Sequence, residues 1–359
     1  MGRKVSLQSC RLQVTERRDE GMNNNSGNDK TMTIHDVARE LGVSASTVSR
    51  AISGKGRIGA ATRDRILDYI EEHGFYPNAA AQSLAQSKTN NIAIILPEVN
   101  TLVDMPFFHT CMYGVEEVAQ ANDYDIIVVT TNGNDTKPLE RLIQNRKVDG
   151  MILTRTYEND KYVKFLKQKQ IPFVAVGKFP DDDVVQVDHD NVGACRELVT
   201  VLFAKGIQNI AYLGSDMDQM VNRCRYQGYE EAYRKGKRKL NPDLVYTDLS
   251  SKAMVEKAVE ELKKSGVECI LCQDDYICDE AVRKLSHMGV RIPDQMKVAS
   301  CHYSRILENY PVTVTSLKFN ITELGRRSCQ VLLDMIHGKT VPDKTLLDYE
   351  IILKESTKG

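Results

Sequence analysis

The sequence predicts an all-α helix-turn-helix headpiece followed by an α/β region of two parallel sheets flanked by helices. Two short helical patterns joined by a glycine turn occupy residues 33–54. From residue 91 onward, apolar strands alternate with amphipathic helices, which is typical of parallel sheets covered on both faces. The strand pattern that opens at Asn91 opens again at Asn209, and matching strands follow in the same order.

Length and composition predict a cytoplasmic protein of two or three domains. The chain has 359 residues, of which 42% are hydrophobic, and its formal net charge is −1. No apolar run approaches the ~18 residues that a membrane-spanning helix needs, so we expect no membrane partner. Residues 1–32 are polar and lack the apolar stretch of a signal peptide. We therefore expect a disordered extension there.

The first predicted helix begins at Thr33, a capping residue with Asp36 in the first turn. Gly42 lets the chain turn without a Cβ penalty, and Ser44 or Ala45 begins the second helix. Apolar residues at helical spacing predict that the two helices face each other: Val37, Ala38, Leu41, Val48, Ala51 and Ile52.

The outward face of the second helix carries short polar groups and one guanidinium: Ala45, Ser46, Thr47, Ser49 and Arg50. Hydroxyl groups and backbone amides bind DNA phosphates, while a few side chains reach base edges in the major groove. Residues 44–65 contain five basic residues and one acidic residue, although the whole chain is nearly neutral. The pattern favours DNA binding over the alternative, an ordinary helical hairpin.

Two further segments complete the N-terminal region. Residues 62–74 predict a third helix with a buried stripe of Ile66, Leu67 and Ile70. Asn78 can cap a short helix that is not stable alone in water. Leu84 is the large apolar residue of that segment. Insertion into a bent minor groove and packing on a neighbouring domain explain Leu84 equally well from the residues alone.

The run from Thr33 to Thr89 resembles the headpiece of the lactose-repressor (LacI/GalR) family of bacterial transcription regulators. The resemblance lies in the strings TIHDVARELGVSASTVSRAISG, TRDRILDYIEEHGFYPNAAAQSLA and NNIAIILPE, and it continues to the last residues. It implies that Ala45, Ser46 and Arg50 read bases and that Leu84 is the minor-groove wedge. It also implies a set of residues that hold the DNA backbone or cap helices near it: Thr33, Ser44, Thr47, Ser49, Arg57 and Asn78.

The α/β region contains three pairs of apolar strands at an offset of roughly 118 residues: 91–97 and 209–214, 148–153 and 267–271, and 171–176 and 296–299. Two such sheets side by side form a cleft at the carboxyl ends of their strands, where α/β proteins bind ligands. This resembles the two-lobed, periplasmic-binding-protein-like effector domain of the family.

We expect four parts of the chain. Composition predicts the disordered extension over 1–32, and the resemblance implies the headpiece over 33–77, a hinge helix or linker over 78–89, and the effector and dimerisation domain over 90–359. The two lobes of the last part would be an N-lobe over about 90–188 with a later return, and a C-lobe over about 190–316 plus a final strand at Leu346–Leu353.

The resemblance also implies which residues bind the effector: Phe107, Phe108, Asp190, Arg225, Asp275 and His302. The planar guanidinium of Arg225 can bind a ligand through two parallel hydrogen bonds. The alternative role for Arg225 is an ion pair on the protein surface. The family's Gly-aromatic-Asp cluster is Ser300-Cys301-His302 in this sequence. His302 in place of the aspartate either changes the preferred ligand, toward an anionic or differently shaped one, or is a structural histidine.

No enzyme motif emerges, since the sequence lacks a Walker loop, a nucleophile elbow and a metal-binding histidine pair. Cys269 and Cys272 have C-x-x-C spacing, but they lie in an apolar run that predicts a strand, so their thiols would point to opposite faces. We therefore expect no cofactor and no metal. We expect a homodimeric repressor that binds a palindromic double-stranded operator and a small-molecule effector. A solute-binding module, the rival class, has no use for the headpiece.

Overall fold

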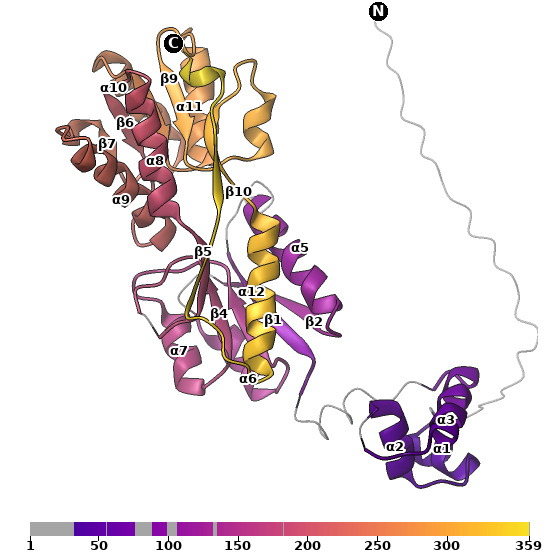
Figure 1. Cartoon of the computed structure of the whole chain (residues 1–359). Helices are drawn as coiled ribbons and strands as arrows, with labels where there is room; N and C mark the ends of the chain where they lie inside the picture. The colour runs from indigo at the N-terminus through magenta and orange to yellow at the C-terminus, as the bar shows by residue number, and fades with distance from the viewer. Residues whose placement is uncertain are drawn as a thin grey trace, which may run out of the picture. The chain divides into compact units, whose positions relative to one another are not determined.

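The computed structural model describes residues 32–54, 56–75, 88–98, 106–131, 135–181 and 183–358 (Figure 1). The chain divides into two compact units, Met1–Gln82 and Ser83–Gly359. Asn78, Leu84 and almost all of the predicted extension lie outside the described residues, so the expectations for them stay predictions.

Three short helices form the described part of the first unit: α1 (Ile34–Glu40), α2 (Ala45–Ser53) and α3 (Ala60–Glu72). Thr33 caps α1 as predicted: its hydroxyl accepts from the Asp36 amide, and the Asp36 carboxylate accepts from the Thr33 amide. Ser44 caps α2 by accepting from the Thr47 amide. Gly42, in the turn between the two helices, has a φ of +65°, which favours glycine.

A small apolar core joins the three helices, with buried side chains from each: Val37, Ala38, Val48, Ala51, Ile66 and Phe75. The prediction for Leu67 is wrong, because this side chain is 38% exposed. Successive residues of a helix point about 100° apart, so α3 can turn Ile66 and Ile70 to the core while Leu67 faces solvent.

Six parallel strands form the first sheet of the second unit, in the order β11-β5-β4-β3-β1-β2. Their bounds are β1 Asn91–Pro97, β2 Asp125–Thr131, β3 Gly150–Leu153, β4 Phe173–Val176, β5 Gln186–His189 and β11 Lys344–Leu347. Its helices are α5 (Pro106–Gln120), α6 (Lys137–Gln144), α7 (Lys161–Lys169) and α12 (Ile321–Ile336). Alternation along β1 sends Ile92 and Ile94 toward α5 and α12, and Ala93 and Ile95 toward α6 and α7.

Six strands also form the second sheet, in the order β12-β10-β9-β8-β6-β7. Their bounds are β6 Ile210–Leu213, β7 Val245–Tyr246, β8 Cys269–Cys272, β9 Lys297–Ser300, β10 Thr315–Phe319 and β12 Tyr349–Ile352. The α-helices α8 (Asn191–Ala204) and α9 (Met220–Lys235) cover one face, and α10 (Lys252–Lys264) and α11 (Asp275–His287) cover the other. Short 3-10 helices complete this half: η2 (Pro242–Leu244), η3 (Arg305–Asn309) and η4 (Glu355–Thr357).

The final strand differs from the prediction. The expected single strand is two strands in different sheets, β11 and β12, separated by Asp348. Figure 1 shows this yellow C-terminal segment running from one sheet to the other. Strands of the first sheet lead toward the cleft, so a chain that continues across it enters the second sheet from the carboxyl end. For that reason β12 is antiparallel to β10. The prediction of a parallel sheet holds for the other five strands of the second sheet but not for β12.

The chain passes between the sheets three times: after β5, after β10, and between β11 and β12. One hydrophobic cluster follows these passages and includes buried residues of α5 and α12 on the first sheet and of α8 and α9 on the second. The two lobes are therefore joined by packing as well as by the chain.

The cysteine prediction is confirmed. Cys269 lies in the cluster under α8 and α9, and Cys272 lies in the cluster under α10 and α11, on the opposite face of β8. All eight cysteines of the described segments are buried and unpaired. No helix in these segments is long and apolar enough to cross a membrane.

Glycines allow two helix pairs to cross at backbone distance. A Cβ atom on Gly114 of α5 would lie 2.0 Å from the Thr322 carbonyl oxygen, and one on Gly325 of α12 would lie 2.0 Å from that of Cys111. Likewise, a Cβ atom on Gly228 of α9 would lie 2.4 Å from the Val192 carbonyl oxygen of α8. Such contacts leave no room for a methyl group.

Gly114→Ala should lower the free energy of unfolding by about 1–3 kcal/mol, because α5 and α12 must separate. This loss would outweigh the roughly 1 kcal/mol that alanine gains as a helix former. Urea unfolding followed by circular dichroism measures the change. Glu116→Ala, at an exposed position of the same helix, is the control and should stay within about 0.5 kcal/mol of wild type. A Gly114→Ala protein as stable as wild type would contradict the tight crossing.

Candidate functional site

The N-terminal end of α2 presents a cluster of hydroxyl groups. Ser44 Oγ lies 2.8 Å from Ser46 Oγ and 2.8 Å from Thr47 Oγ1. Ser46, Ser49 and Arg50 are exposed, whereas Ala45 and Thr47 are partly buried. The hydroxyls lie beside the first amides of the helix, where an anion such as a DNA phosphate is favoured.

The basic residues of the headpiece have different surroundings. The aliphatic part of Arg50 lies over Gly56, where a Cβ atom would come within 3.3 Å of Arg50 Cδ. Arg63 lies beside Gly54, where a Cβ atom would come within 3.3 Å of Arg63 Nη2. Arg57 is exposed. Arg65 instead donates to the Leu41 carbonyl oxygen at 2.9 Å, so it fastens α3 to the end of α1.

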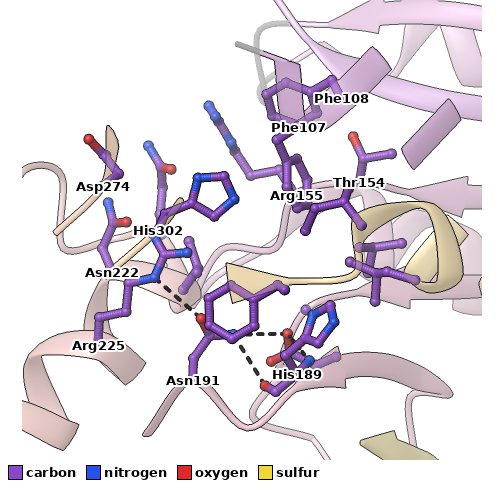
Figure 2. A pocket seen from close by; sticks show the side chains of 18 of the residues that line it. Phe107, Phe108, Thr154, Arg155, His189, Asn191, Asn222, Arg225, Asp274 and His302 are labelled. Carbon is purple, nitrogen blue, oxygen red and sulfur yellow. Dashed lines mark hydrogen bonds between the residues drawn. The ribbon is translucent and has the colours of Figure 1, made fainter. Parts of the chain in front are cut away.

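A cavity of about 150 Å³ lies at the carboxyl ends of the strands of both sheets. Residues from the two lobes and from the passages between them line it, as Figure 2 shows for many of them: Phe107, Phe108, Thr154, Arg155, Asp188, His189, Asn191, Asn222, Arg225, Asp274, Asp275, His302 and Phe319. The structure thus brings five predicted effector residues to one place: Phe107, Phe108, Arg225, Asp275 and His302.

Arg225, on α9, is only 8% exposed, so it is not a surface ion pair. Its Nη1 donates to the Gln273 carbonyl oxygen at 3.0 Å, and its Nε donates to Asn191 Oδ1 at 3.3 Å. Asn191 Nδ2 in turn donates to Asp188 Oδ1 at 3.1 Å (Figure 2). This chain of bonds connects α9 and the end of β8 to the passage that follows β5.

Asp275 and His302 form a pair on the second lobe, with His302 Nδ1 3.2 Å from Asp275 Oδ1. Burial disfavours the charged carboxylate, but the hydrogen bond and charge of His302 outweigh it and lower the pKa of Asp275 below its usual value. The His302 ring lies nearly parallel to Phe319, with centroids 6.2 Å apart, and edge-on to Phe107 at 6.3 Å. His302 is therefore both held by partners and in contact with the cavity.

Burial shifts the pKa values of two neighbouring side chains in opposite directions, and both shifts favour the neutral form. It raises the pKa of Asp188 to about 7, although the His189 amide and the charge of Arg225 oppose the shift. It lowers the pKa of His189 to about 4, assisted by the charges of His302 and Arg225. Within the described residues, the buried Nε2 of His189 has no hydrogen-bond partner.

Asp190 does not line the cavity, contrary to the prediction. Its carboxylate caps α8, with Oδ1 accepting from the Gly193 amide at 2.8 Å. An aspartate directly before a helix satisfies the free amides of the first turn, and this position turns it away from its neighbours Asp188 and His189.

Sequence reasoning missed Arg155, His189 and Phe319 as cavity residues. Each lies at or just after the end of a predicted or observed strand: β3, β5 and β10. The rule that parallel sheets bind ligands at the carboxyl ends of their strands could have found Arg155, because its strand was predicted.

Comparisons with known proteins agree with this architecture. Residues 33–78 match the family described as "Bacterial regulatory proteins, lacI family", and residues 89–355 match "Periplasmic binding proteins and sugar binding domain of LacI family". The transcriptional regulator MalR of Streptococcus pneumoniae serotype 4 is 29% identical over 337 residues, which cover 90% of this chain and 99% of MalR.

Two solved structures extend the comparison. A complex of the transcriptional regulator CelR with cellobiose is 26% identical, with a TM-score of 0.70 over 90% of this chain and 99% of CelR. The lac repressor dimer bound to operator and the anti-inducer ONPF shares the fold at 20% identity. Its TM-score is 0.76 over 92% of this chain and 100% of that one.

Asp188→Asn should flatten the pH dependence of the free energy of unfolding. The folded protein keeps the Asp188 proton up to a pH of about 7, whereas the unfolded chain releases it near pH 3.8. Between these values the native state binds the extra proton, so this group destabilises the fold increasingly as the pH rises. The variant should therefore gain roughly 1–4 kcal/mol over wild type as the pH rises from about 4 to about 7, and no more above that.

Urea unfolding at several pH values measures this difference. The shift of His189 has the opposite sign, but His189 is present in both proteins, so its contribution cancels in the comparison. Asp248→Asn, at an exposed position, is the control. A stability difference between Asp188→Asn and wild type that stays constant with pH would contradict the raised pKa.

Proposed function

The chain belongs to the LacI family of bacterial regulatory proteins, and on this premise we propose that it is a homodimeric repressor controlled by a small carbohydrate or related metabolite. The proposal rests on one observation above all. The cavity is lined by both lobes and by two of the passages that connect them, near Asn191 and Phe319. A ligand there contacts the segments about which the lobes would reorient.

On the DNA side, α2 of each protomer would enter the major groove of one half of a palindromic operator. We assign base reading to Ala45, Ser46 and Arg50, and the minor-groove wedge to Leu84. The remaining headpiece residues would hold the DNA backbone or the helix ends beside it: Thr33, Ser44, Thr47, Ser49, Arg57 and Asn78. Because Ala45 and Ser46 are small, deformation of the DNA at the hinge would contribute much of the sequence discrimination.

On the effector side, the first lobe is the part that would pass the signal on. Asp149 fixes the chain that follows the hinge segment: its Oδ1 accepts from the Thr89 amide at 2.7 Å, and its Oδ2 accepts from the Asn90 amide at 3.0 Å. A change in the angle between the lobes would therefore move the point from which the hinge leaves the effector domain. Phe107, Phe108, Arg225, Asp275 and His302 would bind the effector.

Other classes of function fit the observations less well. A solute-binding module would share the cavity but would have no use for the capped α2 and its arginines. We assign no catalytic activity, since the relatives described above are transcription regulators. As a regulator that binds the chromosome, the protein would act in the cytoplasm.

Selection of bound sequences from a random DNA library tests the proposed function. With the full-length protein, we expect a palindromic consensus and at least about a fivefold change in operator affinity with one compound of a metabolite panel. By linkage, the operator must change the affinity for that compound by the same factor. Absence of any enriched sequence would reject the proposal.

Arg50→Ala should weaken operator binding by about 1–3 kcal/mol if Arg50 makes a bidentate base contact. Gel-shift titrations with the selected operator and with unrelated DNA measure the loss. Operator binding should fall much more than binding to unrelated DNA. Arg39→Ala, an exposed change on α1, is the control and should affect both DNAs little. If Arg50→Ala weakened binding to the operator and to unrelated DNA equally, Arg50 would contact a phosphate and not a base.

A further inference from the structure

Two arginines reach the cavity from opposite lobes. Arg155 follows β3 in the first lobe, and its guanidinium lies 5.1 Å from the centroid of the Phe108 ring. Arg225 belongs to α9 in the second lobe. Figure 2 shows Arg155 on the side of Phe107 and Phe108, and Arg225 across the cavity beside Asn191. A closing cleft would bring both guanidinium groups to one ligand.

Neither guanidinium group forms a close ion pair with a carboxylate of the described residues. Within the described segments, no carboxylate oxygen lies within 4.0 Å of a nitrogen of Arg155 or Arg225. Arg225 donates only to a neutral carbonyl and a neutral amide oxygen. Partly desolvated guanidinium groups without an anion are a strong binding site for carboxylate or phosphate oxygens.

The acidic residues of the cavity already have partners. Asp275 is paired with His302. Asp274 caps α11, with Oδ1 accepting from the Ile277 amide at 2.9 Å. Asp188 Oδ1 accepts from the His189 amide at 2.8 Å and from Asn191. The cavity therefore offers a ligand more free donors than free negative charge.

The remaining lining suits a sugar ring. His189 is 3% exposed, and its Nε2 lacks a partner among the described residues, so it can bond a ligand hydroxyl. Phe107 and Phe319 supply flat apolar surface.

We propose that the effector is a small anionic saccharide whose carboxylate or phosphate is bound jointly by Arg155 and Arg225. The inference rests on the proposed function, because it names the class of ligand for the same cavity. It departs from the neutral disaccharide, cellobiose, bound in the CelR complex.

Calorimetric titration of the full-length protein tests the proposal. The ligands are D-glucuronate, D-galacturonate and glucose-6-phosphate, with the neutral parents glucose and galactose. We expect one acid to bind roughly 10- to 100-fold more tightly than its parent, as charged hydrogen bonds are lost in the parent. The uronates and the phosphate distinguish the two sources of the anion.

Arg155→Gln should bring the affinity for the acid to within about threefold of that for its neutral parent. Arg141→Gln, an exposed arginine of the same lobe on α6, is the matched control and should change neither. Thermal unfolding of each variant checks that it folds. The comparison of acid with parent in the wild-type protein stands whether or not Arg155→Gln folds.

The proposal is wrong if the neutral parent binds as tightly as its acid, or if none of the anionic sugars binds. It is also wrong if folded Arg155→Gln keeps the full preference for the acid. Operator selection on the same protein separates this from the proposed function. Operator binding that responds only to a neutral sugar would overturn the inference alone, whereas absence of operator binding would overturn the proposed function alone.

Discussion

The passages of the chain between the two sheets are the constraint on which the rest of the second unit depends. The parallel strands of both sheets end at the cleft, so each passage crosses it, and two of the three passages contribute residues to the cavity lining. Asn191 and Phe319 lie at two of these passages. The cluster that joins α5 and α12 to α8 and α9 keeps the lobes packed around them. Ligand contacts and lobe orientation are therefore set by the same short segments.

Burial shapes the charges of the cavity. Asp188 and His189 are pushed toward their neutral forms because the fold desolvates them. Asp275 keeps its charge because His302 lies beside it. Arg225 is buried, and its two hydrogen bonds go to neutral acceptors, so its charge has no direct carboxylate partner. The site combines strong directional bonds with little free negative charge.

The headpiece relies on small groups. Ser44 uses its hydroxyl within its own helix end, and Ala45 has no polar side chain, so few long side chains extend from α2. Arg50 is the exception, and it lies over a glycine that leaves room for its stem. The exposed surface of α2 therefore offers short polar groups and one long guanidinium side chain.

Most helices and strands follow from local patterns in the sequence. Caps such as Thr33 and Ser44, the helical spacing of Val48 and Ala51, and the apolar strands act over a few residues, so they can be read locally. Five of the cavity residues were also expected, namely Phe107, Phe108, Arg225, Asp275 and His302, but that expectation came from the resemblance to the family and not from the local pattern.

Other features depend on how distant segments pack. Local spacing could not show that one C-terminal run is divided between two sheets, since that depends on where the sheets lie. Nor could it show that His189 and Phe319 reach the cavity while Asp190 does not. The pairing of His302 with Asp275 joins residues 27 positions apart and exists only because β9 lies next to β8. Contacts between distant segments arise from packing, which no local pattern records.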